Sequence, residues 1–385
     1  MKRLFRNIIF IVLLGFLFLP LLQSNFHVFK IVRLAGAYTP VADTSFSAQG
    51  WFSGKFQTHK EKYLSDTFGL RNLFIRSRNQ VDFDLFKKIN STDFALGNND
   101  DLFPTWYFDS YAGWNFIGTV KLKARLDKLK FLQDAMAKMN KTLLFVLAPS
   151  KTLFNPEDVP AKYNGADSIN YTVCAELLKT EGLNYIDFNS YFIDNKFKSK
   201  YPLFYKNGSH WTAYGACIAG DSIMTILEKL THTKLPHTQW KDNITFDDAN
   251  ADELELEDDL NLLFRQKQDK LGHPHISNPI DTTTKKLGAL LIGDSYILIL
   301  EKRYNFWSNF SGGNLCYYYT QVFPTDDKSF VWINMFNLKE AIQKNDVFIV
   351  ECTESKLNDL GWGFPDSTLK VLNLQMPATV TTKKQ

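Results

Sequence analysis

The stretch Leu290-Leu-Ile-Gly-Asp-Ser-Tyr296 decides the fold class of this chain. Its apolar run ends at Gly293 and does not alternate with polar residues, which is typical of a buried strand in a parallel sheet. Gly293 permits a sharp turn after the strand, and the apolar run Tyr296–Leu300 would begin the next element. Because open α/β sheets bind ligands at the carboxyl ends of their strands, Ser295 is predicted to lie where a substrate binds.

Similar apolar runs recur along the chain and alternate with helical patterns. Strands are predicted at 142–148, 183–188, 287–292, 315–323 and 346–351, and a strand or turn at 101–107. Helices are predicted at 121–139, 171–180 and 213–230, and a helical pattern also covers 51–90. Strands that alternate with helices form a mainly parallel sheet covered by helices on both faces, so the predicted fold class is α/β.

The amino terminus is predicted to be a membrane anchor. Lys2, Arg3 and Arg6 precede an uncharged segment, 7–26, whose apolar core is 8–22. No small-residue cleavage site follows, and flanking apolar residues extend the core towards the length of a membrane span, so we expect an uncleaved anchor; a cleaved signal peptide is the alternative. Basic residues before the span place the amino terminus in the cytoplasm and the rest of the chain in the periplasm, outside the inner membrane.

A chain of 385 residues exceeds one typical domain. We expect a cytoplasmic tip and anchor at 1–30, a linker and helical lead-in at 31–100, the α/β domain at 101–375 and a tail at 376–385. An acidic insertion at 240–280 interrupts the α/β domain. Its acidic run lacks the glycine and ligand spacing of a calcium loop, so we expect it to be solvated. The residues of that run are Asp247, Asp248, Asp252, Glu253, Glu255, Glu257, Asp258 and Asp259.

Composition excludes several classes of function. Aromatic residues make up 15% of the chain, including 33 Phe, which indicates a globular fold. The formal charge is +3 and no basic block is present, so a nucleic-acid partner is not expected. The pair His273 and His275 has no third ligand nearby, so we expect neither a metal nor another cofactor. The cysteines are scattered and are expected to be small buried hydrophobes, although disulfides remain open for an exported protein; they are Cys174, Cys217, Cys316 and Cys352.

Ser295 and His210 form the candidate catalytic pair. A serine nucleophile needs a base within hydrogen-bond reach and donors for the oxyanion. His210 lies in Asn207-Gly-Ser-His-Trp211, on a predicted loop before an apolar helix, and is the best base in the chain. Backbone amides around Ser295 would be the oxyanion donors, and the supporting or oxyanion candidates beside the pair are Trp211, Asp294 and Tyr296.

On these residues the sequence resembles the SGNH/GDSL hydrolases, whose nucleophile block is Gly-Asp-Ser after a buried strand. The His210-Trp211 pair precedes Ser295 in the chain, which resembles the alginate O-acetyltransferase group, where the SGNH order is circularly permuted. The likeness extends over roughly 50–365. Looser motifs that agree are Asp66–Arg71, Gly97–Phe103 and Ala148–Lys151.

The resemblance implies a membrane-tethered periplasmic enzyme that O-acetylates an exported polysaccharide through an acetyl-serine intermediate. It also implies a multi-pass membrane-bound O-acyltransferase as the partner that supplies acetyl groups. A carbohydrate esterase with the same site, which passes the acyl group to water, is one alternative. A non-catalytic glycan-binding or scaffold subunit of an export complex is the other.

One position departs from the family pattern. The family's motif is Asp-x-His-Trp, in which the Asp orients the histidine, and here that position is Gly208. The strand and loop where SGNH enzymes place an oxyanion Asn carry Glu351, Thr353 and Glu354 instead, so these would line the site. Either carboxylate would then orient His210, or a backbone carbonyl or water would do so; we favour the second arrangement.

Four further residues are candidates for substrate binding, because they lie beside predicted strand ends. They are Ser150, Lys151, Tyr205 and Lys206. Asp187 also ends a predicted strand, where an aspartate commonly caps a turn or helix.

Overall fold

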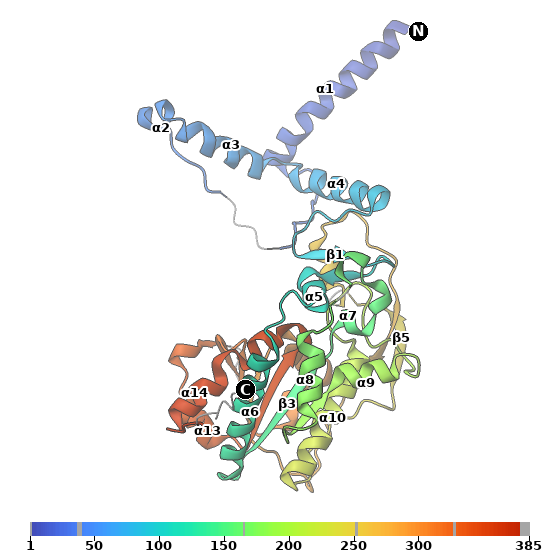
Figure 1. Cartoon of the computed structure of the whole chain (residues 1–385). Coiled ribbons are helices and arrows are strands. Elements are labelled where there is room, and N and C mark those ends of the chain that lie inside the picture. Colours follow the sequence, from blue (N-terminus) through green and yellow to red (C-terminus); the bar gives the residue numbers. More distant parts are fainter. Residues whose placement is uncertain (1, 37–40, 165, 251–252, 326–328, 378–385) are drawn as a thin grey trace. The chain divides into compact units, whose positions relative to one another are not determined.

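The computed structural model describes residues 2–36, 41–164, 166–250, 253–325 and 329–377 (Figure 1). The chain divides into two compact units. Unit 1 comprises 1–92 together with 255–267, and unit 2 comprises 93–254 and 268–385. Two sequence predictions fall outside the described residues, namely Asp252 of the acidic run and the tail from 378 to 385.

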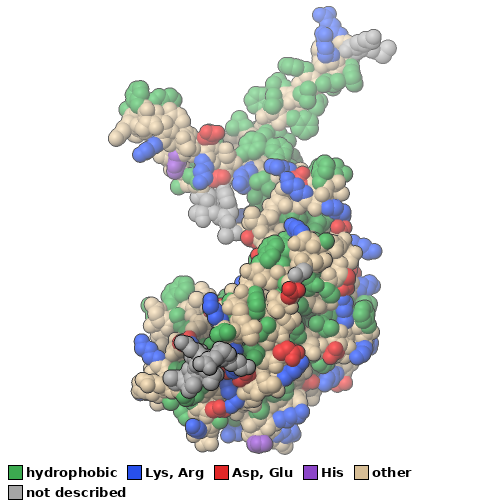
Figure 2. All heavy atoms as spheres, in the orientation of Figure 1, with side chains coloured by type: hydrophobic (Ala, Val, Ile, Leu, Met, Phe, Trp, Pro, Cys, Tyr) green, Lys and Arg blue, Asp and Glu red, His purple; other side chains and the backbone are tan. Residues whose placement is uncertain are grey.

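Unit 1 contains the predicted anchor and the helical lead-in. Its helices are α1 (Lys2–Phe26), α2 (Ala48–Phe52), α3 (Lys55–Thr67), α4 (Arg71–Phe86) and α11 (Glu255–Asp259). The 24-residue stretch Arg3–Phe26 of α1 is long and apolar enough to cross a membrane. Its apolar side chains are exposed along its length (Figure 2). Part of the acidic insertion belongs to this unit, because Arg76 and Asn79 on α4 donate hydrogen bonds to the carbonyls of Leu262 and Leu260.

Unit 2 is built on a seven-stranded sheet in the order β10-β9-β8-β7-β11-β3-β4. The strands are β3 (Thr142–Ala148), β4 (Tyr185–Asp187), β7 (Ala289–Gly293), β8 (Gly313–Tyr317), β9 (Gln321–Pro324), β10 (Val331–Trp332) and β11 (Val347–Thr353). The five strands from β8 to β4 are parallel, whereas β9 and β10 pair antiparallel at one edge. The predicted α/β fold with a mainly parallel sheet is therefore confirmed.

Helices cover both faces of this sheet (Figure 1). On one face lie α9 (Phe188–Asn195), α10 (Ala213–Thr231) and α12 (Ser295–Tyr304). On the other lie α6 (Thr119–Ala137), α8 (Asn170–Leu178), α13 (Leu338–Lys344) and α14 (Phe364–Val371). Residues of β3 alternate between the two cores, with Leu144 and Val146 in the first and Leu143 and Phe145 in the second. A strand buried on both faces has no polar face, which explains the unbroken apolar runs in the sequence.

One predicted element differs in detail. The predicted strand at 315–323 is a hairpin, because the chain turns at Tyr318 and Tyr319 and returns as β9. The hairpin was missed because a tight turn between apolar residues leaves little trace in hydrophobic periodicity. The segment 101–107, predicted to be a strand or turn, supplies β2 (Leu102–Pro104), which pairs with β1 (Phe94–Leu96), and the start of α5 (Thr105–Tyr111).

The acidic insertion is only partly solvated. In unit 2 it forms an antiparallel hairpin of β5 (Ile244–Asp248) and β6 (Lys270–Pro274), on which Asp247 and Asp248 are exposed. Glu253 and Glu257 are buried, contrary to the expectation that the whole run is solvated. Glu253 lies 3.6 Å from Arg303 and 3.6 Å from His273, and these basic partners explain how a carboxylate is accommodated inside the protein.

Candidate active site

Ser295 is the first residue of α12, directly after the carboxyl end of β7. Asp294 is the N-cap of this helix, and its side chain accepts a hydrogen bond from the Tyr296 amide at 3.0 Å. The first-turn amides of a helix have no acceptor within the helix, so the backbone N–H of Ser295 is placed to bind a developing negative charge. The sharp strand-to-helix turn thus presents a hydroxyl and an oxyanion donor together.

His210 meets Ser295 in the fold. Its Nε2 lies 2.7 Å from Ser295 Oγ, which is hydrogen-bond distance for a base and its nucleophile. The loop that carries His210 is held at both ends. Phe204 and Trp211 pair through their backbones in an isolated antiparallel β-bridge, and the Thr212 hydroxyl caps α10 by accepting from the Gly215 amide. The predicted pair is therefore assembled by β7 and by the loop before α10.

The other side of the imidazole faces a network of hydroxyl groups. Ser209 Oγ lies 3.2 Å from His210 Nδ1. The phenol of Tyr296 donates to the Ser209 carbonyl at 2.9 Å, and the phenol of Tyr107 lies 3.2 Å from that of Tyr296. The ring of Tyr296 packs edge-on against His210, with the ring centroids 4.8 Å apart. Tyr296 and Tyr107 thus hold the backbone that carries the histidine.

Trp211 is a packing residue. Its side chain is fully buried, and its ring packs edge-on against those of Phe188 and Tyr296 at 5.7 and 4.9 Å. It therefore fixes the direction in which the chain leaves His210 and does not face the substrate.

Glu351 and Thr353 support the nucleophile turn rather than the histidine. Glu351, on β11, accepts a hydrogen bond from the Asp294 amide at 2.9 Å through Oε2. Thr353 donates to Asp294 Oδ2 through both its amide and its hydroxyl. Burial, and next the charge of Asp294, raise the pKa of Glu351 well above its ordinary value. Because the Thr353 donors are engaged by Asp294, Thr353 is not placed to bind an oxyanion.

Glu354 lies at the next turn and is fully buried. Ser110 on α5 donates to its Oε1 at 2.8 Å. Burial raises the pKa of Glu354 to about 7, and the hydrogen bonds of Ser110 and Ser150 oppose the rise. The partners of Glu351 and Glu354 are thus Asp294 and Ser110, and neither glutamate is paired with His210.

Gly208 is required by packing. A Cβ built at this position would lie 2.7 Å from the Tyr205 ring and 3.2 Å from the Glu253 carbonyl oxygen. An aspartate in the family's position would therefore displace Tyr205. The acidic insertion reaches this loop, so the space that the family's aspartate needs is filled here.

Tyr318 is a site residue that sequence reasoning missed. Its phenol lies near Ser295, and burial and then the charge of Asp294 raise the pKa of this phenol above its ordinary value. Its amide donates to the Gly293 carbonyl at 2.9 Å, and its ring packs edge-on against Trp362 at 5.2 Å. Both Tyr318 and Trp362 have a φ of 46°, a left-handed conformation that is costly for aromatic residues and persists only when the surroundings impose it. The signal in the sequence was the three tyrosines at 317–319, hidden within the predicted strand.

Lys151 makes structural contacts in place of the substrate contact that we expected. It is fully buried, and its Nζ donates to the carbonyls of Leu102, Lys206 and Gly208 at 2.8, 2.6 and 3.2 Å. Burial lowers its pKa to about 8, and the charge of Asp101, 3.6 Å away, opposes the shift. Lys151 therefore ties the His210 loop to β2.

The other predicted substrate contacts are also mostly internal. Ser150 is buried and its hydroxyl lies 2.8 Å from that of Thr152. Tyr205 is buried beside Gly208, whereas the side chain of Lys206 is 36% exposed and lies 3.9 Å from Asp101. Asp187 caps α9 by accepting from the Asn189 amide at 2.9 Å. Lys206 and Asp187 are only partly buried, whereas Ser150 and Tyr205 are buried.

No metal cluster is found within the described part of the chain, where no three His, Cys, Asp or Glu side chains gather. All four cysteines are buried free thiols. His273 lies 3.6 Å from Glu253 and 3.2 Å from the Asn250 side chain, so it has a structural role in the hairpin.

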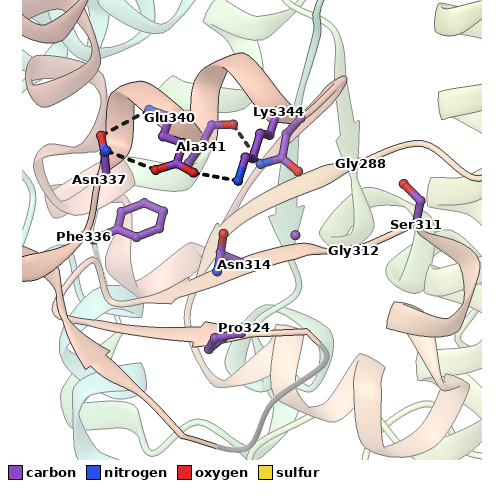
Figure 3. Close-up of a pocket in the computed structure, with 12 residues that line it drawn as sticks. Gly288, Ser311, Gly312, Asn314, Pro324, Phe336, Asn337, Glu340, Ala341 and Lys344 are labelled. Atoms are coloured by element: carbon purple, nitrogen blue, oxygen red, sulfur yellow. Dashed lines mark hydrogen bonds and ion pairs between the residues drawn. The ribbon is translucent and has the colours of Figure 1, made fainter.

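A cavity of about 480 Å³ lies at the amino ends of the parallel strands, opposite the end that carries Ser295 (Figure 3). Its lining includes Gly288, which precedes β7, whereas Ser295 follows the same strand. The polar groups in it are engaged with one another, because Lys344 pairs with Glu340 at 2.6 Å and Asn337 caps α13 (Figure 3). The amino ends of parallel strands are not where such sheets place their reactive groups, and the cavity is separate from the catalytic pair.

The arrangement of strands and reactive residues matches a known family. The family described as "SGNH hydrolase-like domain, acetyltransferase AlgX" matches residues 95–307, which is more than half of the chain and includes both His210 and Ser295. The chain belongs to this AlgX family. No curated protein sequence matches the chain.

Three solved structures resemble this AlgX-family chain. The O-acetyltransferase domain of Pseudomonas putida AlgJ has 15% identity and a TM-score of 0.46, and the match covers 73% of this chain and 99% of that domain. Pseudomonas aeruginosa AlgX has 15% identity and a TM-score of 0.43, with 72% and 71% covered. Bacillus cereus PatB1 has 12% identity and a TM-score of 0.42, with 62% and 91% covered.

Proposed function

We propose that this AlgX-family chain transfers acetyl groups to hydroxyls of an exported polysaccharide through an acetyl-Ser295 intermediate. The observation that carries the proposal is the 2.7 Å contact between His210 Nε2 and Ser295 Oγ at the carboxyl end of a parallel strand. Family membership supports the acetyl group as the group transferred. The polysaccharide acceptor rests on the family resemblance alone.

In the first half-reaction, His210 takes the Ser295 proton while Oγ attacks the acetyl carbonyl of the donor. The tetrahedral oxyanion accepts hydrogen bonds from the Ser295 amide and the Tyr318 phenol. The intermediate then collapses: the bond to the donor's leaving oxygen or sulfur breaks, that atom takes the proton from His210, and acetyl-Ser295 remains.

In the second half-reaction, a sugar hydroxyl gives its proton to His210 and attacks acetyl-Ser295. Collapse of the second tetrahedral intermediate releases the acetylated sugar, and the Ser295 oxygen recovers the proton from His210. Water in place of the sugar gives the esterase reaction with the same residues. The acceptor therefore distinguishes a transferase from an esterase, and the catalytic pair does not.

The site is proposed to work in the periplasm, tethered to the inner membrane by α1. The support is the length and apolar surface of that helix and the basic residues at its amino end. A multi-pass membrane-bound O-acyltransferase is the proposed source of acetyl groups. Sequencing the amino terminus of the membrane-extracted protein tests the tether, because a mature chain that starts near residue 25 indicates a cleaved signal.

Ser295→Ala tests the function. The purified chain is incubated with an acetyl-ester reporter, and the substitution should abolish turnover while the thermal midpoint stays near that of the wild type. A variant that keeps more than about a tenth of the wild-type rate would exclude Ser295 as nucleophile. Mass spectrometry of the polysaccharide, from cells with the wild type or with the variant, then separates added acetyl groups from removed ones. A chain inactive on the reporter and without effect on the polysaccharide would be the scaffold.

A further inference from the structure

The turn between α3 and α4 packs directly against the carboxyl-terminal part of α1. Gly69 lies in this turn, and a Cβ built there would be 2.4 Å from the Pro20 carbonyl oxygen and 2.5 Å from the Ser24 amide. Ser24 Oγ also lies 3.4 Å from the Thr67 carbonyl oxygen. Only glycine permits so close an approach of two backbones, so the position of this turn along α1 is well defined.

The contact sets the depth of the turn relative to a membrane. Arg6 is the last basic residue before the apolar part of α1, and Pro20 and Ser24 follow it by roughly 21 and 27 Å of helix at 1.5 Å per residue. The hydrocarbon core of a bilayer is about 30 Å thick. With Arg6 at the cytoplasmic boundary, the turn against Pro20 and Ser24 lies in about the outer third of the hydrocarbon core, among the upper parts of the acyl chains.

The side chains around the turn fit that depth. Phe68 and Phe74 are 40% and 53% exposed, and their ring centroids are 5.9 Å apart. Leu64 on α3 and Leu73 on α4 are 56% and 37% exposed. An exposed pair of Phe rings is unfavourable in water, whereas Phe and Leu side chains on a helix surface commonly insert into the boundary between lipid headgroups and acyl chains.

We propose that the surface formed by the contacting rings of Phe68 and Phe74 lies in the outer interface of the bilayer that α1 crosses. Its partner is phospholipid, and Phe68 and Phe74 lie among the upper parts of the acyl chains. The surface would give unit 1 a second contact with the membrane, in addition to the anchor helix α1. This inference rests on α1 being an uncleaved anchor and is independent of the acetyl-transfer chemistry.

The test uses the full-length chain in nanodiscs of phosphatidylethanolamine and phosphatidylglycerol. The four native cysteines are buried, so a cysteine introduced by Phe74→Cys can be labelled selectively with a polarity-sensitive fluorophore. Val120→Cys on α6 is the matched control, because Val120 is also apolar and is 84% exposed in unit 2. Lipids spin-labelled near the top of the acyl chain should quench the Phe74→Cys label several-fold more than the Val120→Cys label.

Equal lipid quenching of the two labels, with equal access to aqueous iodide, would overturn the proposal. A Phe74→Cys label shielded from both lipid and iodide would also overturn it and would indicate a protein partner such as a second copy. Reporter turnover of each labelled chain is measured in parallel. An inactive Ser295→Ala background should leave the quenching unchanged, so failure of the enzymatic proposal is distinguishable from failure of this one.

Discussion

His210 Nε2 and Ser295 Oγ lie 2.7 Å apart although 85 positions separate the two residues along the chain. The contact joins a loop before α10 to the first residue of α12. Each side is fixed by its own network, with the Tyr107 and Tyr296 phenols behind the histidine and Asp294 with Glu351 behind the serine. The pair is thus preorganised by buried groups that do not react, and these networks suggest specific tests.

His210 should be required for turnover, because its Nε2 is the base that lies 2.7 Å from Ser295 Oγ. His210→Ala should therefore abolish turnover of the acetyl-ester reporter, while His275→Ala should retain it. Similar reporter rates for the two variants would argue against His210 as the base.

Tyr318→Phe should lower kcat by on the order of 10²-fold, because it removes one oxyanion donor and keeps the ring that packs on Trp362. Burial raises the pKa of the Tyr318 phenol, so it stays protonated and the shape of the pH profile should not change. Tyr319→Phe is the matched control, since the Tyr319 ring packs against Phe364. Similar kcat values for both variants would remove Tyr318 from the oxyanion site.

Glu351→Gln should retain most of the activity, whereas Glu351→Leu should not. Burial raises the pKa of Glu351 and so favours its neutral form, and glutamine keeps an oxygen for the Asp294 amide. Leucine leaves that buried N–H without its acceptor, at a cost of about 1–3 kcal/mol in the free energy of unfolding. Reporter kinetics and thermal midpoints distinguish the variants. A hundredfold loss in the glutamine variant would instead mean that a carboxylate at this position takes part in catalysis.

Glu354 should make the protein less stable as the pH rises from about 4.5 to about 7. Its folded pKa of about 7 exceeds the ordinary value, so in this window the folded state holds a proton that the unfolded state has released. Stability falls with pH when the folded state binds more protons, and the effect levels off above the folded pKa. Thermal midpoints across this range should therefore decline less in Glu354→Gln than in the wild type. Exposed Glu340→Gln is the control, and identical slopes in all three chains would contradict the assignment.

Lys151→Met should destabilise the protein and lower kcat, although Lys151 does not reach the substrate. Its ammonium holds the Lys206 and Gly208 carbonyls, and each buried hydrogen bond lost costs about 1–3 kcal/mol. The His210 loop would lose its tie to β2. Lys206→Met, which removes a partly exposed lysine from the same loop, should change stability much less. Equal effects of the two substitutions would show that the buried contacts are not what matters.

The sequence by itself determined the fold class, the apolar first helix and the two candidate catalytic residues. Parallel strands buried on both faces must be uniformly apolar, so β3, β7 and β11 were visible as unbroken runs. Ser295 and His210 were visible because each follows a recognisable pattern at the end or start of an element. These features depend on residues that are close together in the chain, so they can be recognised in a single sequence.

Only the tertiary structure decided what surrounds the pair. Three charged residues at strand ends were expected from the sequence to line the site, namely Lys151, Glu351 and Glu354. All three are fully buried. Tyr318 reaches Ser295 only because the chain reverses within an apolar run that resembles one strand. A glycine is needed at position 208 because the Glu253 carbonyl, from a distant part of the chain, and the Tyr205 ring, from the same loop, fill the space that a side chain would take. Burial and long-range contacts depend on how elements pack together, and no pattern along the chain encodes that packing.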